Sequence, residues 1–244
     1  MSDLTSLRAI IKLRAKLNSS YIDACIADAL RHVRNEQLHF NTGSFTFATT
    51  NGTAEYPLPN DFLSILGEVY YTPDEASESG RYKLQPVGLD ELEEYRYRQD
   101  WGADEISGES RRVAIDLSGR KILFAPTPDT DGDKVFFRYL KDLGTPVYTA
   151  STTASAPPSL SPTITLLGPD GQTLNSDYTT PWFTHAFELV ANRAVHILWS
   201  KYHGGTPEAA QKAQEAQVAY LEELSRLRGE TSMKTNHLRI RPYI

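Results

Sequence analysis

Few residues of this chain have the types and spacing that metal or acid–base chemistry requires. His185 and His196 fall on one face of an expected helix, but about 16 Å of helix rise would separate them, too far for one metal ion. The run from Asp129 to Asp133 is similar to a calcium-binding loop, but the glutamate that such a loop needs downstream is missing. We therefore expect packed histidines and a solvated turn, with no metal site.

Nucleophilic and cofactor chemistry has equally little support. The sequence lacks the GxSxG, P-loop, HExxH and CxxC patterns. Its single cysteine, Cys25, lies in an apolar helical run, which favours a buried structural thiol over a nucleophile. Asp90, Glu93 and Glu94 are the best carboxylates for an unrecognised hydrolase, although adjacent helical residues do not converge. We therefore expect no cofactor and no enzymatic activity.

Composition limits the class of protein further. The chain has 244 residues, 25 Lys and Arg against 31 Asp and Glu, and a formal net charge of −6. There is thus no global basic footprint for nucleic acid. The N-terminal segment is amphipathic rather than signal-like, and no apolar run approaches the roughly 20 residues that span a bilayer. The sequence predicts a soluble protein without membrane contact.

Helical patterns occupy both ends of the chain. Residues 3–17 and 21–38 repeat apolar positions at helical spacing, and the first segment also carries a basic strip of Arg8, Lys12, Arg14 and Lys16. This strip is either a solvated face or a contact with an acidic neighbour or DNA. Thr180-Pro181 and Thr206-Pro207 are typical helix starts, and Gly204 and Gly229 typical stops, so two further helices are expected over 181–203 and 207–228.

The middle of the chain follows the period of β-strands. Asn51-Gly52 and Ser118-Gly119 each separate two short extended runs, which predicts two hairpins, and a short helix is expected over 89–99. Residues 144–162 are rich in Ser, Thr, Ala and Pro and should be extended or mobile.

The sequence thus predicts an α+β fold in three parts. Residues 1–42 and 180–229 form a helical bundle from the two ends of the chain, and residues 43–179 form an inserted, antiparallel β-rich domain. Residues 230–244 form an extended C-terminal tail with the basic residues Lys234, Arg239 and Arg241 and no acidic residue after Glu230. Within 181–203 the apolar residues cover nearly every face, which is typical of a helix buried in a core or an interface.

The order of these signals resembles the head-to-tail connector, or adaptor, proteins of tailed bacteriophages. The relevant stretches are IDACIADALRHVRNE, FNTGSFTFATTNGTAEYPLPNDFLSILGEVYY, YKLQPVGLDELEEY and RKILFAPTPDTDGDKVFFRYLKDL, followed by the helical pair 180–228. That family has a T-x-x-G-x-x-x-Y-x-L-P-x-D-F segment, an L-x-P-V/I-x-x-D-E-L helix start and an L-x-P-x-P-D turn. Residues 144–179 depart from the pattern because they are longer and contain an extra hairpin.

The resemblance implies a structural virion protein at the head–tail junction. Identical subunits, twelve in the family, would form a ring below the portal protein, extend the DNA channel and offer a docking face to the tail nozzle or tail tube protein. Genomic DNA would pass through without specific binding, and the host cytoplasm would hold the protein during assembly. In related adaptors the C-terminal segment reaches the portal; carried over, Leu238, Ile240 and Tyr243 would be apolar anchors, and Arg239 and Arg241 would meet acidic portal residues.

A closed ring also gives the apolar helix 181–203 a role. We expect Trp182, Phe187 and Trp199 to divide between the subunit core and the contact between subunits. The alternative function is a β-rich tail or baseplate module that binds a host surface glycan. Its aromatic platform would consist of Tyr70, Tyr71, Tyr95, Tyr97 and Trp101.

Overall fold

The computed structural model of the chain has an α+β fold in two compact units. Residues 1–41 and 142–244 make up the helical unit, and residues 42–141 make up the β unit. The structure describes residues 3–17, 19–73, 80–97, 110–144, 147–151, 163–168, 171–175 and 178–237. In the described part, no helix is both long and apolar enough to cross a membrane.

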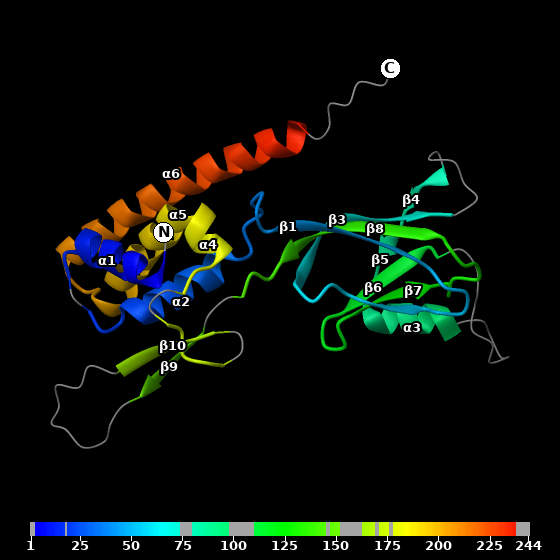
Figure 1. Cartoon of the computed structure of the whole chain (residues 1–244), viewed down its shortest axis with the longest axis horizontal. Coiled ribbons are helices and arrows are strands. Elements are labelled where there is room, and N and C mark those ends of the chain that lie inside the picture. The colour runs from blue at the N-terminus through cyan, green and yellow to red at the C-terminus, as the bar shows by residue number, and fades with distance from the viewer. Residues whose placement is uncertain are drawn as a thin grey trace. The chain divides into compact units, whose positions relative to one another are not determined.

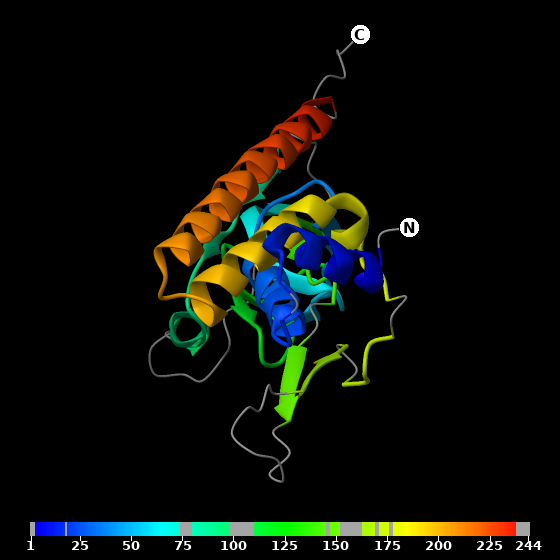
Figure 2. The ribbon, with the colours of Figure 1, turned by 90° about the vertical axis from the view of Figure 1, so that its left-hand side faces the viewer.

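The helical unit combines segments from both ends of the chain (Figures 1 and 2). Its elements are α1 (Leu4–Ala15), α2 (Ile22–Val33), α4 (Pro181–His185), α5 (Phe187–Ile197), the π-helical turn η2 (Leu198–Tyr202), α6 (Pro207–His237) and the antiparallel pair β9 (Val147–Ser151) and β10 (Thr163–Leu167). Asp3 caps α1 by accepting a hydrogen bond from the Ser6 amide, and Thr180 caps α4 in the same way through Trp182.

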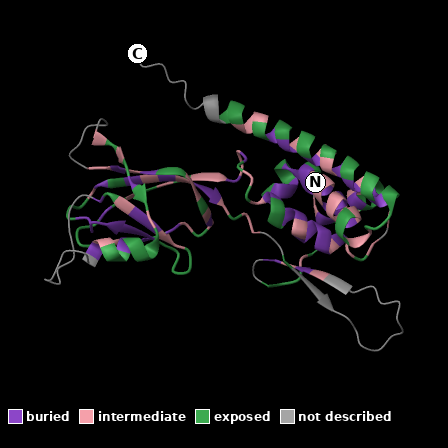
Figure 3. Ribbon diagram, turned by 180° about the vertical axis from the view of Figure 1, so that it is seen from behind, coloured by how far each residue is buried: buried purple, intermediate pink, exposed green. Residues whose placement is uncertain are grey.

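Helix α5 is the centre of this unit because α1, α2 and α6 all pack against it. Small residues line the contacts, among them Ala27 and Ala29 of α2, Ala191 and Ala194 of α5, and Ala216 of α6. Alanines let helix axes approach closely, and larger side chains such as Leu7, Ile11 and Leu30 fill the remaining space. The burial pattern shows α6 with a buried stripe toward α5 and an exposed opposite side (Figure 3).

The expectation of one continuous helix over 181–203 was wrong. Ala186 has φ −135° and ψ 32°, so it ends α4 and starts α5 in a new phase. Near the other end, η2 widens the turn, and the amide of His203 bonds the carbonyl of Leu198. These two irregularities change the helical phase, so that apolar residues from each segment face the same core. This explains why the apolar residues would cover nearly every face of a single continuous helix.

The expected helix end at Gly229 was also wrong, because α6 continues to His237. Glycine in a helix interior costs about 1 kcal/mol relative to alanine, which is not enough to stop a helix that has other contacts. Arg226 pairs with Glu223 and Glu230, and the Thr231 hydroxyl donates to the carbonyl of Leu227. The expected extended tail over 230–244 is therefore helical through residue 237.

The β unit contains two four-stranded sheets and one helix. The first sheet has the order β1-β8-β3-β4 and the second β2-β7-β6-β5. The elements are β1 (Thr42–Ala48), β2 (Glu55–Pro57), β3 (Phe62–Thr72), β4 (Tyr82–Lys83), β5 (Gln85–Pro86), α3 (Leu89–Tyr97), β6 (Arg112–Asp116), β7 (Lys121–Ala125) and β8 (Lys134–Lys141). All neighbouring strands in the two sheets are antiparallel except the short pair β5 and β6.

Alternation along the strands arranges this unit in three layers (Figure 1). Phe124 of β7 faces Phe137 of β8 in an aromatic core between the two sheets. The next residue of β7, Leu123, points the other way and packs against Leu92 of α3. Helix α3 and the outer side of the first sheet therefore lie on opposite sides of the β unit.

Two further expectations differ from the structure. Residues 42–48 and 55–57 do not pair with each other across Asn51-Gly52; β1 pairs with β8, and β2 with β7, in different sheets. The Ser118-Gly119 hairpin forms as predicted, between β6 and β7. The β unit ends at Lys141 rather than 179, because β9 and β10 contact α2 of the helical unit.

Candidate assembly surfaces

A groove crosses the helical unit, with α5 as its floor and α1 and α6 as its walls. It has a volume of roughly 470 Å³ and is lined by Asn192 and Val195 on the floor, Lys16 at the end of α1, and Glu215 and Ala219 on α6. Lys16 is the C-cap residue of α1, with φ 50°, and its side chain lines the groove. The groove offers apolar and charged groups to a partner, but no converging set of catalytic side chains.

The three aromatic residues expected between subunits have different environments. Trp182 is 1% exposed, so within this fold it belongs to the core of the helical unit. Phe187 and Trp199 are half-buried at the edge of that core. Trp199 lines the groove, and the ammonium of Lys212 lies 4.4 Å from its ring centre. Phe187 and Trp199 stay candidates for an intersubunit contact, and Trp182 does not.

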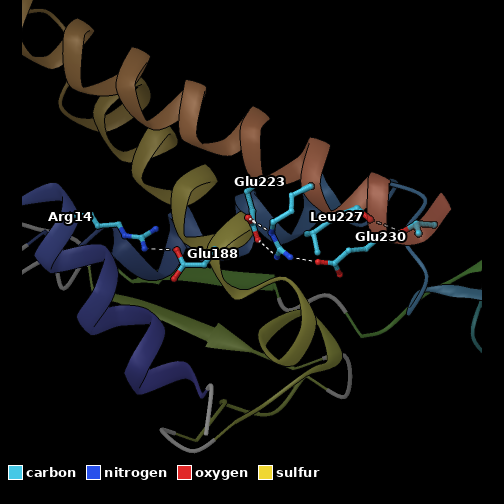
Figure 4. A network of polar contacts seen from close by, with 7 residues as sticks. Arg14, Glu188, Glu223, Leu227 and Glu230 are labelled. Carbon is cyan, nitrogen blue, oxygen red and sulfur yellow. Dashed lines mark hydrogen bonds and ion pairs between the residues drawn. The ribbon is translucent and has the colours of Figure 1, made fainter. Parts of the chain in front are cut away.

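Two of the four residues in the basic strip of α1, Arg8 and Arg14, are paired within the unit. Arg8 forms a two-pronged bond to Asp23 at 2.7 Å. Arg14 bonds Asn192 and also pairs with Glu188, both on α5, as Figure 4 shows for Glu188. Part of the strip therefore fastens α1 to α2 and α5, a role that the sequence could not distinguish from a solvated face.

A polar clamp joins the end of α6 to the loop after α2. The His39 amide donates to the Thr231 hydroxyl at 3.0 Å, and the Lys234 ammonium lies 2.9 Å from His39 Nε2. One turn earlier, Arg228 pairs with Glu36 at 2.6 Å. Burial, followed by the charge of Lys234, lowers the pKa of His39, which keeps the ring neutral and able to accept from Lys234. The clamp therefore holds the last described turns of α6 against the segment that follows α2.

Aromatic rings pack next to His39, one of the residues of the clamp. Phe40 stacks on His185 and meets the edge of Trp182, with ring centres 5.1 Å apart in both cases. His185 also contacts His39 edge to face. His185 is thus a packing residue, and His196 bonds the Ala213 carbonyl through Nδ1 at 3.0 Å. The two histidines serve separate contacts, as predicted from their spacing.

The proposed portal-binding residues Leu238, Arg239, Ile240, Arg241 and Tyr243 lie outside the described residues. Their role stays a prediction. In the sequence they come directly after His237, the last residue of α6.

Two carboxylates of the expected turn, Asp131 and Asp133, have structural partners, and Cys25 is buried. Asp133 is 3% exposed and accepts hydrogen bonds from the hydroxyls of Tyr71 at 2.5 Å and Thr130 at 2.7 Å. Asp131 accepts from the Asn51 amide. Burial raises the pKa of the Cys25 thiol to about 12, so the thiolate that a nucleophile needs is suppressed. Among the described residues, no group of three potential ligands could hold a metal ion.

The aromatic platform of the glycan-binding alternative does not form among the described residues. Tyr71 is fully buried, and the guanidinium of Arg81 lies over the ring of Tyr70 at 4.0 Å. Arg112 lies over Tyr95 at 3.9 Å. The side chain of Tyr97 and all of Trp101 lie outside the described part of the structure. Tyr71 is therefore closed to a sugar, and Arg81 occupies a ring face of Tyr70.

The described part of the structure presents surfaces suited to contact with other macromolecules. The comparison with protein families agrees: residues 2–241 match the SU10 adaptor protein family, and the chain belongs to that family of bacteriophage structural proteins. No curated protein matches the chain. The family assigns the protein to the virion and does not correspond to a class of enzyme.

Proposed function

We propose that this protein is a head-to-tail adaptor. Twelve copies form a ring below the portal protein, extend the DNA channel and present the docking face for the tail nozzle or tail tube protein. The observation that carries the proposal is the match to the SU10 adaptor family over residues 2–241, nearly the whole chain. A match of that extent includes both units and the C-terminal segment as far as residue 241, so it concerns the whole architecture rather than one module.

The end of α6 supports a docking role for the C-terminal segment. The clamp of His39, Thr231 and Lys234 holds the last turns of α6 against the helical unit. A segment anchored at a fixed point loses less conformational entropy on binding than one that leaves a frayed helix. In the proposal, Leu238, Ile240 and Tyr243 enter apolar pockets of the portal, and Arg239 and Arg241 pair with its acidic residues.

Truncation tests the proposal on portal-bearing capsids of the phage that encodes this chain. Deleting residues 238–244 leaves α6 and its clamp intact, so the protein should stay folded while its binding to capsids falls by about a hundredfold or more. Circular dichroism and hydrogen exchange check the fold, and co-sedimentation measures binding.

Two matched variants separate anchoring from charge. Joint substitution of Leu238, Ile240 and Tyr243 by Ala should weaken binding at all salt concentrations, because apolar burial is insensitive to screening. Substitution of Arg239 and Arg241 by Gln should weaken binding mainly at low salt. Normal capsid binding by the truncated protein would exclude the proposed role of the segment.

A further inference from the structure

The outer side of the sheet β1-β8-β3-β4 carries a concentration of positive charge. Cross-strand register places Thr46, Phe136 and Tyr70 in one row and Ser44, Arg138 and Leu66 in the next. Lys83 of β4 lies opposite Tyr70, and Lys134 precedes Phe136 by two residues on β8. These side chains share a face because their neighbours Val135 and Phe137 point into the core. We call Arg81, Lys83, Lys134 and Arg138 the basic face.

Two aromatic rings hold part of this face in place. The guanidinium of Arg81 lies 4.0 Å from the ring centre of Tyr70 and 5.0 Å from that of Phe136. A guanidinium held over aromatic rings keeps N–H donors that can bond a carboxylate. Arg81 is therefore a prearranged donor for carboxylates.

In the part of the β unit that the structure describes, Lys83 is the member of the basic face with an ion-pair partner. That partner is Glu68, which accepts from Lys83 at 2.6 Å and from the hydroxyl of Tyr70 at 2.8 Å. Within the described residues, Arg81, Lys134 and Arg138 have no carboxylate partner. This excess of cations stands out because residues 42–141 contain more acidic than basic residues.

The opposite side of the same unit carries the complementary charge. Helix α3 packs through Leu92 on the second sheet and turns Asp90, Glu91, Glu93 and Glu94 outward, all of them exposed. Glu91 forms an ion pair with Arg112 at 3.7 Å. We call Asp90 and Glu93 the acidic face of α3.

We propose that neighbouring copies of this chain meet through these surfaces, with the basic face of one β unit against the acidic face of α3 on the next. The inference rests on the proposed ring. A contact between two different faces of identical subunits is heterologous, and it produces a closed ring when the rotation between copies closes. Faces of opposite sign on opposite sides of one unit are the arrangement that such a contact needs.

Two observations favour a second copy over nucleic acid as the occupant of the basic face. The rings of Tyr70 and Phe136 are covered by Arg81, so they are not free for stacking with bases. The acidic surface that complements the basic face is present on every copy of the chain. Tight nucleic-acid binding, in contrast, usually requires many phosphate contacts, and the basic face consists of four cationic residues. Binding of DNA to the basic face is the competing outcome of the test.

Charge reversal tests the contact with the full chain. Variant A carries R81E and R138E, and variant B carries D90R and E93R. Each variant alone opposes like charges at every contact, so its assembly into rings on capsids, or at high concentration in solution, should fall about tenfold or more. A mixture of A and B restores opposite charges in an alternating ring, as does one chain with all four changes, and both should recover assembly.

The control variant is E55K together with K121E, which exchanges the two ends of an exposed ion pair between β2 and β7 and should assemble normally. Hydrogen exchange confirms that each variant is folded. In wild-type rings made from mixed ¹⁴N and ¹⁵N chains, a zero-length carbodiimide should join Lys83 or Lys134 of one copy to Asp90 or Glu93 of another.

Each outcome decides a different point. Recovery in the A and B mixture with the expected cross-links supports the contact. Wild-type rings that neither variant disturbs overturn the contact but leave the adaptor proposal standing. A wild-type chain that forms no ring on portal-bearing capsids overturns the adaptor proposal and this contact with it. Loss of DNA binding by variant A, with ring assembly intact, assigns the basic face to nucleic acid instead.

Discussion

The two units of this protein are stabilised in different ways. The helical unit is closed by many small and medium-sized residues, such as Ala27, Ala191 and Ala216, and by polar contacts between segments far apart in sequence. The β unit depends on a few large rings, including Phe124 and Phe137, and on one buried carboxylate, Asp133. Loss of one large ring leaves a cavity that neighbours cannot fill, whereas loss of one surface contact does not. Loss of a large core ring of the β unit should therefore cost more than loss of one surface contact of the helical unit.

The largest effect expected is that of Phe137→Ala in the β unit. Removal of this fully buried ring should lower the free energy of unfolding by about 3–5 kcal/mol. Hydrogen exchange read unit by unit should show the loss in residues 42–141 and unchanged protection in α5. Equal loss of protection in both units would mean that they unfold as one and would remove the basis of the comparison.

Tyr71→Phe should rank next. It removes the hydroxyl that donates to Asp133 and leaves a buried carboxylate with one bond fewer, at a cost of about 1–3 kcal/mol. Tyr70→Phe is the matched control, because its hydroxyl bonds the exposed Glu68 and should matter by less than about 0.5 kcal/mol. Chemical denaturation measures both; similar losses in the two variants would contradict the role given to Asp133.

In the helical unit, Thr231→Val should cost about 1 kcal/mol, because it removes the acceptor of the His39 amide while keeping the shape of the side chain. The last turns of α6 should then exchange faster, and α5 should not change. Thr231→Ser keeps the hydroxyl and serves as the control. Unchanged exchange in the Val variant would show that the clamp does not hold the end of α6.

Gly229→Ala should stabilise the helical unit by about 0.5–1 kcal/mol, since an added Cβ meets no atom within 4 Å and alanine favours the helix. Gly205→Ala is the contrasting variant and should destabilise, because Gly205 has φ +107°. Thermal melting measures both. A loss of stability in Gly229→Ala would indicate that the helix ends there after all.

The smallest effect concerns pH. Burial is the first cause that lowers the pKa of both His32 and His39 below the ordinary value of 6.5, so the folded state binds fewer protons than the unfolded one as the pH falls through that value. Stability should therefore decrease below about pH 6.5, before the carboxylates titrate. His39→Gln should reduce this slope, and a slope that both single variants at His32 and His39 leave unchanged would contradict the assignment.

The elements of this fold were readable from the sequence where local signals were strong. The start of α4 at Thr180-Pro181, the β6–β7 hairpin and the α+β class follow from residue types within a few positions of each other. The order of motifs also indicated the adaptor resemblance, which agrees with the family match. Local propensity is sufficient for such features because their partners lie close in the chain.

Pairings between distant segments were not readable. The turn at Asn51-Gly52 exists, but β1 and β2 join β8 and β7 because those partners extend the two sheets. The clamp between His39 and Thr231 has no local signal, and neither has the joint position of Arg81 and Arg138. Alternation of Lys134, Phe136 and Arg138 could have indicated that one face of this strand is exposed and basic. It could not have indicated that Lys83 of another strand adds to the same face.

The sequence by itself determined the class of fold, the positions of most elements, the absence of known catalytic motifs and the family resemblance. Only the tertiary structure decided that Trp182 belongs to the core, that α6 runs through Gly229, and that opposite charges lie on opposite sides of the β unit. The physical reason is that burial, helix continuation and surface charge depend on which distant segments meet, and local patterns contain no information about that.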